Sequence, residues 1–133
     1  MQFPTDLAPV SPATLEAFDR VARAAEESAT AACLAHDDPG ATMGAEAERM
    51  LLTGMGFVTR MLRASMTFAA GGILADELGW AQTRLPVYGV SHRMILDNFR
   101  RYDTALQGQL TAAEYAEIRP YLDYLKEAPF DVS

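Results

Sequence analysis

The chain has 133 residues, half of them apolar and 22% charged, which is the balance of one folded globular domain and excludes a disordered polypeptide. Its net charge of −7 argues against partners such as nucleic acid or an anionic membrane surface. The single cysteine excludes an internal disulfide, and the first residues lack the basic and apolar regions of a secretory signal. The twelve uncharged residues between Arg63 and Asp76 are too few to cross a bilayer, so we expect a cytoplasmic protein.

The N-terminal residues 1–10 contain two prolines and little periodicity, and we expect them to form an arm on the surface or on a partner. Ser11 followed by Pro12 has the pattern of an N-cap with proline at the first helical position. Apolar and small residues then recur every three to four positions, which predicts a helix over residues 12–36. The Asp-Asp-Pro-Gly segment at 37–40 predicts a loop with solvated acids.

A second long helix is expected from about Thr42, and its apolar residues cover a wide arc, as in a central helix. Its predicted buried face consists of Met50, Leu51, Gly54, Phe57, Val58, Met61, Leu62, Ser65 and Phe68 or Ala69. Gly71 and Gly72 each weaken a helix by roughly 1 kcal/mol relative to alanine, which predicts a break near residues 70–73. A shorter helix is expected from about 73 to 84.

A loop is predicted at 85–90, and Ser91 has the character of an N-cap for a helix over 92–109. Thr111-Ala112-Ala113-Glu114 matches the capping box that begins many helices. In the helix that follows, Pro120 removes a backbone hydrogen bond and crowds the preceding turn, so a kink or a restart is expected at 119–120.

About five helical segments with no alternating strand pattern predict an all-α fold, packed as a bundle or in a globin-like way. The predicted organisation is a single helical domain over residues 11–128, followed by a C-terminal tail at 129–133.

Cys33 and His36 place a thiol and an imidazole three residues apart on one face of the first helix. The spacing resembles small helical peroxidase-linked thiol proteins, in which a Cys-x-x-Cys pair precedes a nearby histidine. Thr30 stands where the first cysteine of that pattern would be, which excludes a dithiol cycle within one subunit. We interpret Cys33 first as a buried small residue, and alternatively as the thiol of a redox enzyme that uses His36.

His92 lies in the first turn of its helix, where a neutral imidazole is available as a ligand. We expect an exposed residue there, with a haem or metal ligand as the alternative. Neither histidine has a glutamate three residues before it, and the chain contains no zinc-protease, phosphate-loop or nucleophile-elbow motif. Zinc and phosphoryl chemistry are therefore not expected.

Methionine, phenylalanine and small residues alternate along residues 50–72, which suits an adaptable core, a cavity for a flat apolar ligand or the helix of a second subunit. The candidate ligand-binding residues are Phe57, Met61, Phe68, Trp80, Tyr88 and His92. Arg93, Arg100, Arg101 and Tyr102 form a basic and aromatic group on the same helix, and its arginines are expected to pair within the chain, with Asp97 or Asp103. The alternative is that this group binds an acidic ligand or an acidic partner.

Residues 62–110 resemble the second half of globin-superfamily sensor domains. The similar segments are Leu62-Arg63, Phe68-Ala69-Ala70-Gly71-Gly72, Tyr88-Gly89-Val90-Ser91 and the helix with Met94, Leu96, Phe99 and Tyr102. Phycobiliproteins and globin-coupled sensors have comparable sequences. Leu85 stands where haem sensors place the proximal histidine, and Phe57, Val58 and Thr59 stand where phycobiliproteins place the bilin cysteine.

This resemblance implies a cofactor-free sensor similar to the input domains of bacterial stressosome proteins. We therefore predict a non-catalytic sensory or regulatory domain that forms a homodimer through its small-residue and methionine-rich helix faces. It could also bind a regulatory protein or, non-covalently, a small apolar ligand. The alternatives are a haem-binding sensor that uses His92 or His36, and a thiol-dependent redox enzyme that uses Cys33 and His36.

Overall fold

The computed structural model describes residues 7–127, except for the side chains of Gln82, Thr83 and Tyr88. Over that range the chain forms one compact domain of six α-helices and one short 3₁₀ helix without a β-strand, so the all-α prediction is confirmed. The elements are α1 (Pro12–His36), α2 (Gly40–Met43), α3 (Ala47–Phe68), α4 (Gly71–Arg84), the 3₁₀ helix η1 (Leu85–Tyr88), α5 (His92–Gln109) and α6 (Ala112–Lys126).

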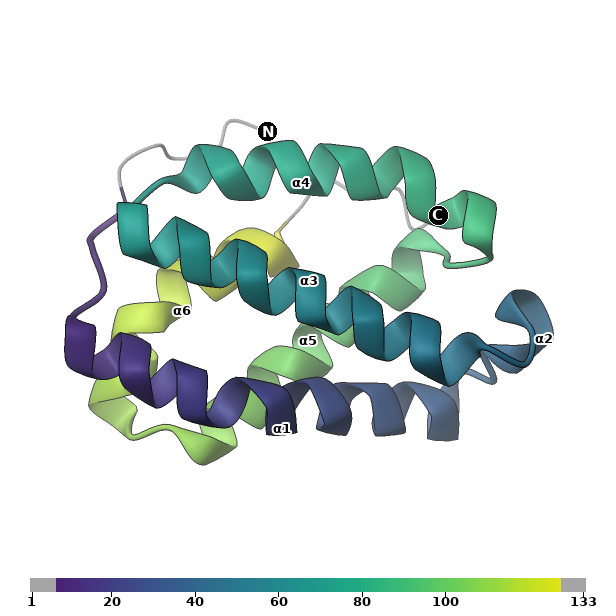
Figure 1. Cartoon of the computed structure of the whole chain (residues 1–133), viewed down its shortest axis with the longest axis horizontal. Helices are drawn as coiled ribbons and strands as arrows, with labels where there is room; N and C mark the ends of the chain where they lie inside the picture. Colours follow the sequence, from purple (N-terminus) through teal and green to yellow (C-terminus); the bar gives the residue numbers. More distant parts are fainter. Residues whose placement is uncertain (1–6, 128–133) are drawn as a thin grey trace.

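The helices α1, α3 and α4 run side by side in alternating directions, and α5 and α6 lie behind them (Figure 1). Helix α1 packs against both α3 and α5, and α5 packs against α6. The core between these helices is filled by fully buried side chains from five of them: Phe18, Leu62, Met66, Leu74, Tyr102, Leu106, Ile118, Tyr121, Leu122 and Leu125. Helix α4 covers one side of α3 and contributes Leu74 and Leu78 to the core.

Local capping places the helix starts where the sequence predicts them. The Ser11 hydroxyl accepts a hydrogen bond from the backbone N–H of Thr14 at the start of α1. The carboxylate of Glu117 on α6 accepts hydrogen bonds from the Ser11 backbone N–H, at 2.9 Å, and from the hydroxyl groups of Ser11 and Thr14. Both arms of the predicted capping box are formed at the start of α6. These side chains satisfy backbone N–H groups that a helix end otherwise leaves unpaired.

The predicted second helix from about Thr42 is divided, because the chain turns at Gly44 between the short α2 and α3. Gly44 has φ +86°, a conformation that favours glycine. Gly89, before α5, has φ +85°, and a side chain there would overlap the carbonyl group of Thr42. The turn before α5 can therefore pack against α2 only with glycine at this position.

The break between α3 and α4 lies slightly earlier than predicted. Helix α3 ends at the cap residue Ala69, which has φ 51°, and α4 already includes Gly71 and Gly72. The backbone N–H of Ala70 donates to the carbonyl oxygen of Ser65 at 3.0 Å and closes the last turn of α3. Gly71 is buried within the first turn of α4 and does not end α3.

The chain does not restart at 119–120, because α6 continues through Pro120 from Ala112 to Lys126. The alternative expectation, a kink at Pro120, stays a prediction. Pro120 is exposed, whereas Ile118 and Tyr121 on either side of it are fully buried. Burial of apolar side chains on both sides offsets the backbone hydrogen bond that proline removes.

The described part of the predicted N-terminal arm, residues 7–10, lies against α6. Val10 is buried, and the carbonyl oxygen of Ala8 accepts a 2.9 Å hydrogen bond from the hydroxyl of Tyr121. Residues 1–6 and the predicted tail at 129–133 lie outside the described residues. None of the described helices has both the length and the hydropathy required to cross a membrane.

Candidate functional site

The structure separates the two residues of the predicted redox pair. Cys33 is fully buried in the core, whereas His36 is exposed at the C-terminal end of α1. Burial raises the pKa of the Cys33 thiol, and the nearby Asp37 carboxylate acts in the same direction. These surroundings oppose the thiolate form that nucleophilic chemistry needs.

The candidate ligand-binding residues do not form one buried group. Phe57 and Phe68 are 62% and 72% exposed, so their predicted place on the buried face of the second helix is wrong. Met61 is half-buried, and Trp80 on α4 is 51% exposed. These residues lie along α3 and α4.

The remaining two ligand candidates belong to the segment before α5. His92 lies in the first turn of α5. Its side chain was expected to be exposed, but it is half-buried. Tyr88 ends η1, and its side chain lies outside the described part of the chain.

Polar residues on α1 form a line that sequence reasoning missed. Glu26, Thr30, Cys33 and Asp37 follow one another at intervals of four, three and four residues, so they share one face of the helix, and we call them the polar seam. Three of them are buried, and Asp37 is half-buried. Glu26 is a charged residue, yet it is only 5% exposed.

At one end of the polar seam, a hydroxyl of α3 connects α1 to α5. The Thr59 hydroxyl donates to the Glu26 carboxylate at 2.7 Å and lies 2.6 Å from the Tyr102 hydroxyl. The Arg23 guanidinium donates to the other Glu26 oxygen at 3.3 Å. Burial raises the pKa of Tyr102, which keeps its hydroxyl protonated. A buried carboxylate is thereby paired and hydrogen-bonded, as burial of charge requires.

At the other end, Arg101 of α5 reaches Asp37 in a two-pronged ion pair. Its Nη1 and Nη2 atoms lie 2.7 and 3.2 Å from the two Asp37 oxygens, and Nη1 also donates to the Asn98 side-chain oxygen. The predicted pairing within α5 is confirmed for Arg100, which lies 3.4 Å from Asp97, but it is wrong for Arg101, and Asp37 is not a solvated loop acid. The hydrogen bonds from Arg101 hold the pKa of Asp37 below its usual value.

Asp103 is buried and faces α6 instead of the arginines of its own helix. It accepts a hydrogen bond from the Tyr115 hydroxyl at 2.5 Å and pairs with Lys126 at 2.5 Å. Burial and this carboxylate raise the pKa of Tyr115 to about 12. The three residues connect α5 to α6.

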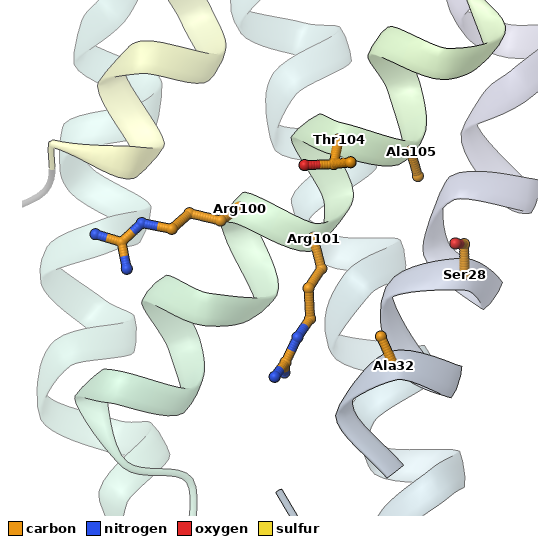
Figure 2. A pocket seen from close by; sticks show the side chains of 6 residues that line it. All are labelled: Ser28, Ala32, Arg100, Arg101, Thr104 and Ala105. Atoms are coloured by element: carbon orange, nitrogen blue, oxygen red, sulfur yellow. The ribbon is translucent and has the colours of Figure 1, made fainter. Parts of the chain in front are cut away.

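A shallow groove of about 300 Å³ runs between α1 and α5, beside the polar seam (Figure 2). Its lining residues are Ser28, Ala32, Arg100, Arg101, Thr104 and Ala105. Figure 2 shows Arg100 pointing away from α1, and Arg101 is already engaged by Asp37. The walls of the groove are therefore small side chains with little polar chemistry. Among residues 7–127, no group of three or more His, Cys, Asp or Glu side chains is placed to hold a metal.

Four large apolar side chains remain on the surface of α3, α4 and η1, and we call Phe57, Phe68, Trp80 and Val87 the apolar surface. Val87 is 80% exposed. The guanidinium of Arg60 stacks on the Phe57 ring at 4.5 Å, and that of Arg84 lies 5.7 Å from the Trp80 ring. Aromatic rings with arginine beside them are typical of the residues that dominate protein interfaces.

Comparison with known proteins adds no assignment, because no family model, curated protein or solved structure matches the chain. The resemblance of residues 62–110 to globin-like sensor domains therefore stays a prediction.

Proposed function

We propose that this protein is a non-catalytic sensory or regulatory domain of the cytoplasm that acts as a homodimer, without a bound cofactor. The observation that supports this proposal is the exposure of Phe57, Phe68 and Trp80 on two neighbouring helices. Exposed aromatic side chains are typical of protein interaction sites, because their burial on association is favourable.

The interior of the domain supports the same proposal. Both carboxylates of the polar seam have partners, since Glu26 is bound by Thr59 of α3 and Asp37 by Arg101 of α5. Such paired groups stabilise a fold and leave no charged side chain of the seam available for acid–base chemistry. The redox alternative receives less support than a structural role for Cys33, because the thiol is buried and its pKa is raised.

Sedimentation velocity over a range of protein concentrations tests this proposal. The expected result for the wild-type chain is a reversible increase from monomer to dimer, and the Phe57→Ser/Phe68→Ser variant is expected to remain monomeric. Leu34→Ser is the matched control, because Leu34 is a large apolar residue on α1 that is 36% exposed but lies outside the apolar surface. This control should dimerise like the wild type.

A wild-type chain that stays monomeric up to about 100 μM would contradict the homodimer. The cofactor-free part of the proposal has a separate test, in which haem is added to the purified protein. The expected spectrum shows no Soret band beyond that of free haem, whereas a band that disappears in His92→Ala or His36→Ala would favour the haem-binding alternative.

A further inference from the structure

Helix α3 carries a second line of apolar and small residues, apart from the line that faces the core. These residues are Met50, Gly54, Phe57, Met61, Ala64 and Phe68, and we call them the outer seam. They follow one another at intervals of four, three, four, three and four residues. None of the six is buried, and Phe57 and Phe68 are among the most exposed apolar side chains described.

The inner line of the same helix consists of Leu51, Met55, Val58, Leu62 and Met66, which are all buried. At 3.6 residues per turn, the outer seam lies about 100° around the helix from this inner line. A helix that is buried on one face needs no second apolar line for its own fold. Alternating intervals of three and four residues are the pattern by which one helix packs along another.

We infer that the N-terminal half of the outer seam, Met50, Gly54 and Phe57, pairs with the same residues of a second copy of this chain, with the two α3 helices antiparallel about a two-fold axis beside Thr53. This inference rests on the proposed homodimer and specifies where and how its subunits meet. About a two-fold axis, the same surface patch of each subunit contacts its copy on the other subunit. One seam per subunit is therefore enough to form the dimer.

The charges beside the outer seam favour the antiparallel direction. Glu46, Thr53, Arg60 and Thr67 recur every seven residues, so they lie on one flank of the seam. With the axis beside Thr53, Glu46 of each copy faces Arg60 of the other, seven residues away on either side. A parallel pair would instead place Glu46 beside Glu46 and Arg60 beside Arg60.

The present contacts of these charged residues are compatible with an exchange of partners. Glu46 pairs with Arg49 at 2.5 Å on the exposed side of the helix, where ion pairs contribute little. Arg60 stacks on Phe57 and can keep this contact while its guanidinium reaches a carboxylate across the interface.

The exposed ring of Phe57 gives the proposed contact an apolar centre. An aromatic side chain presents about 150–250 Å², so Phe57 and Phe68, which are 62% and 72% exposed, leave about 100–150 Å² each to bury. With the axis beside Thr53, residues 47–59 of the two α3 helices overlap, so the two Phe57 rings meet there and supply about 200–300 Å² of apolar surface, whereas Phe68 lies beyond the end of the partner's α3. Gly54 lies next to the axis, and without a side chain it lets the two backbones approach closely.

Spin labels on two threonines of the flank test this arrangement. Thr53→Cys and Thr67→Cys, each in a Cys33→Ala background, carry the label at equivalent exposed positions two heptads apart. In the antiparallel pair, the two labels at residue 53 lie close together, below about 20 Å, and those at residue 67 lie about 40 Å apart, from a rise of 1.5 Å per residue. Electron paramagnetic resonance measures both distances.

The possible outcomes separate this inference from the proposed homodimer. Short distances at both positions mean a parallel pair, and long distances at both mean that the subunits meet elsewhere. Either result overturns the inference while the homodimer stands. If neither label shows coupling between subunits and the labelled protein sediments as a monomer, both proposals fail, and the outer seam belongs to a different partner.

A charge reversal provides an independent readout of the same contact. Glu46→Arg and Arg60→Glu are each expected to weaken dimerisation by about three- to thirtyfold, because each change affects two symmetric ion pairs. The Glu46→Arg/Arg60→Glu double variant should return to within about threefold of the wild type. Additive weakening in the double variant would contradict the contact between Glu46 and Arg60.

Discussion

The interfaces of α1 with α3 and α5 and the outer face of α3 differ in where they place polar and apolar groups. At the first, the buried Glu26 is bound by Thr59 of α3, and the half-buried Asp37 is bound by Arg101 of α5. At the second, apolar rings such as Phe57 lie outside. Buried polar groups with partners are explained by the fold itself. Exposed apolar groups such as these are not explained by the fold, and we propose that they contact another molecule.

This difference predicts that substitutions in the two regions affect different properties. Changes in the polar seam and its partners should alter the free energy of unfolding, and changes on the outer face should alter association. Each of the following predictions tests this difference. A large loss of stability from a change on the outer face, or no loss from a change in the polar seam, would contradict it.

The largest effect on stability is expected from Tyr102→Ala. Tyr102 is fully buried, so the substitution leaves a large cavity and should lower the free energy of unfolding by about 3–5 kcal/mol. Phe57→Ala is the matched control on the outer face, and the monomer should lose less than about 0.5 kcal/mol. Urea denaturation at a protein concentration where the chain is monomeric measures both values. Equal losses would contradict the distinction between the two regions.

Arg101→Gln is expected to cost about 1.5–3 kcal/mol at pH 7, because it removes charged hydrogen bonds to the half-buried Asp37. The pKa of Asp37 is lower in the folded than in the unfolded chain, so this stabilisation is present above the unfolded value of about 3.9. It is lost as the pH falls through the lower folded value. Urea titrations of both proteins at pH 7, 5 and 3 should therefore converge at the acidic end, and a constant difference would refute the ion pair.

Thr59→Val is expected to cost about 1–3 kcal/mol, because it keeps the shape of the side chain but leaves the buried Glu26 and Tyr102 without their shared partner. Thr67→Val is the matched control at the exposed end of the same helix, where the hydroxyl donates to the Arg63 carbonyl oxygen of its own helix. Thermal unfolding should separate the two variants by several degrees. If the control loses as much as Thr59→Val, the contact between Glu26 and Thr59 contributes nothing.

The smallest effect on the stability of the monomer is expected from Phe57→Ser/Phe68→Ser, the variant that should abolish the dimer. Because both rings are exposed, the free energy of unfolding at low protein concentration should change by less than about 0.5 kcal/mol per site. Chemical denaturation at about 1 μM checks this value. A loss of several kcal/mol would show that the rings belong to the core.

The sequence predicts the helix limits well where a cap decides them and poorly where packing does. Ser11 and Ser91 begin α1 and α5 at the expected residues because a hydroxyl satisfies nearby backbone N–H groups. The end of α3 at Ala69 was missed, because the neighbouring glycines are stronger breakers by propensity than alanine. Tertiary contacts at the start of α4 outweigh that propensity.

The candidate site was also predicted poorly where tertiary packing decides the structure. The apolar residues of α3 were predicted as one wide buried arc, although the spacing of Met50, Gly54 and Phe57 contains the signal for a separate line. The pairing of Arg101 with Asp37 spans 64 residues, so no local pattern could reveal it. An acid such as Glu26 near an apolar stripe gives only a weak sign of burial, because its partner Thr59 is known only from the fold.

Native mass spectrometry of the wild-type chain and of Phe57→Ser/Phe68→Ser, at the same micromolar concentration, tests most directly whether the outer face of α3 holds two subunits together. The expected result is a species of twice the 14.5 kDa chain mass for the wild type and the single chain mass for the variant. A wild-type spectrum with only the 14.5 kDa species, or a variant that remains a dimer, would contradict the account.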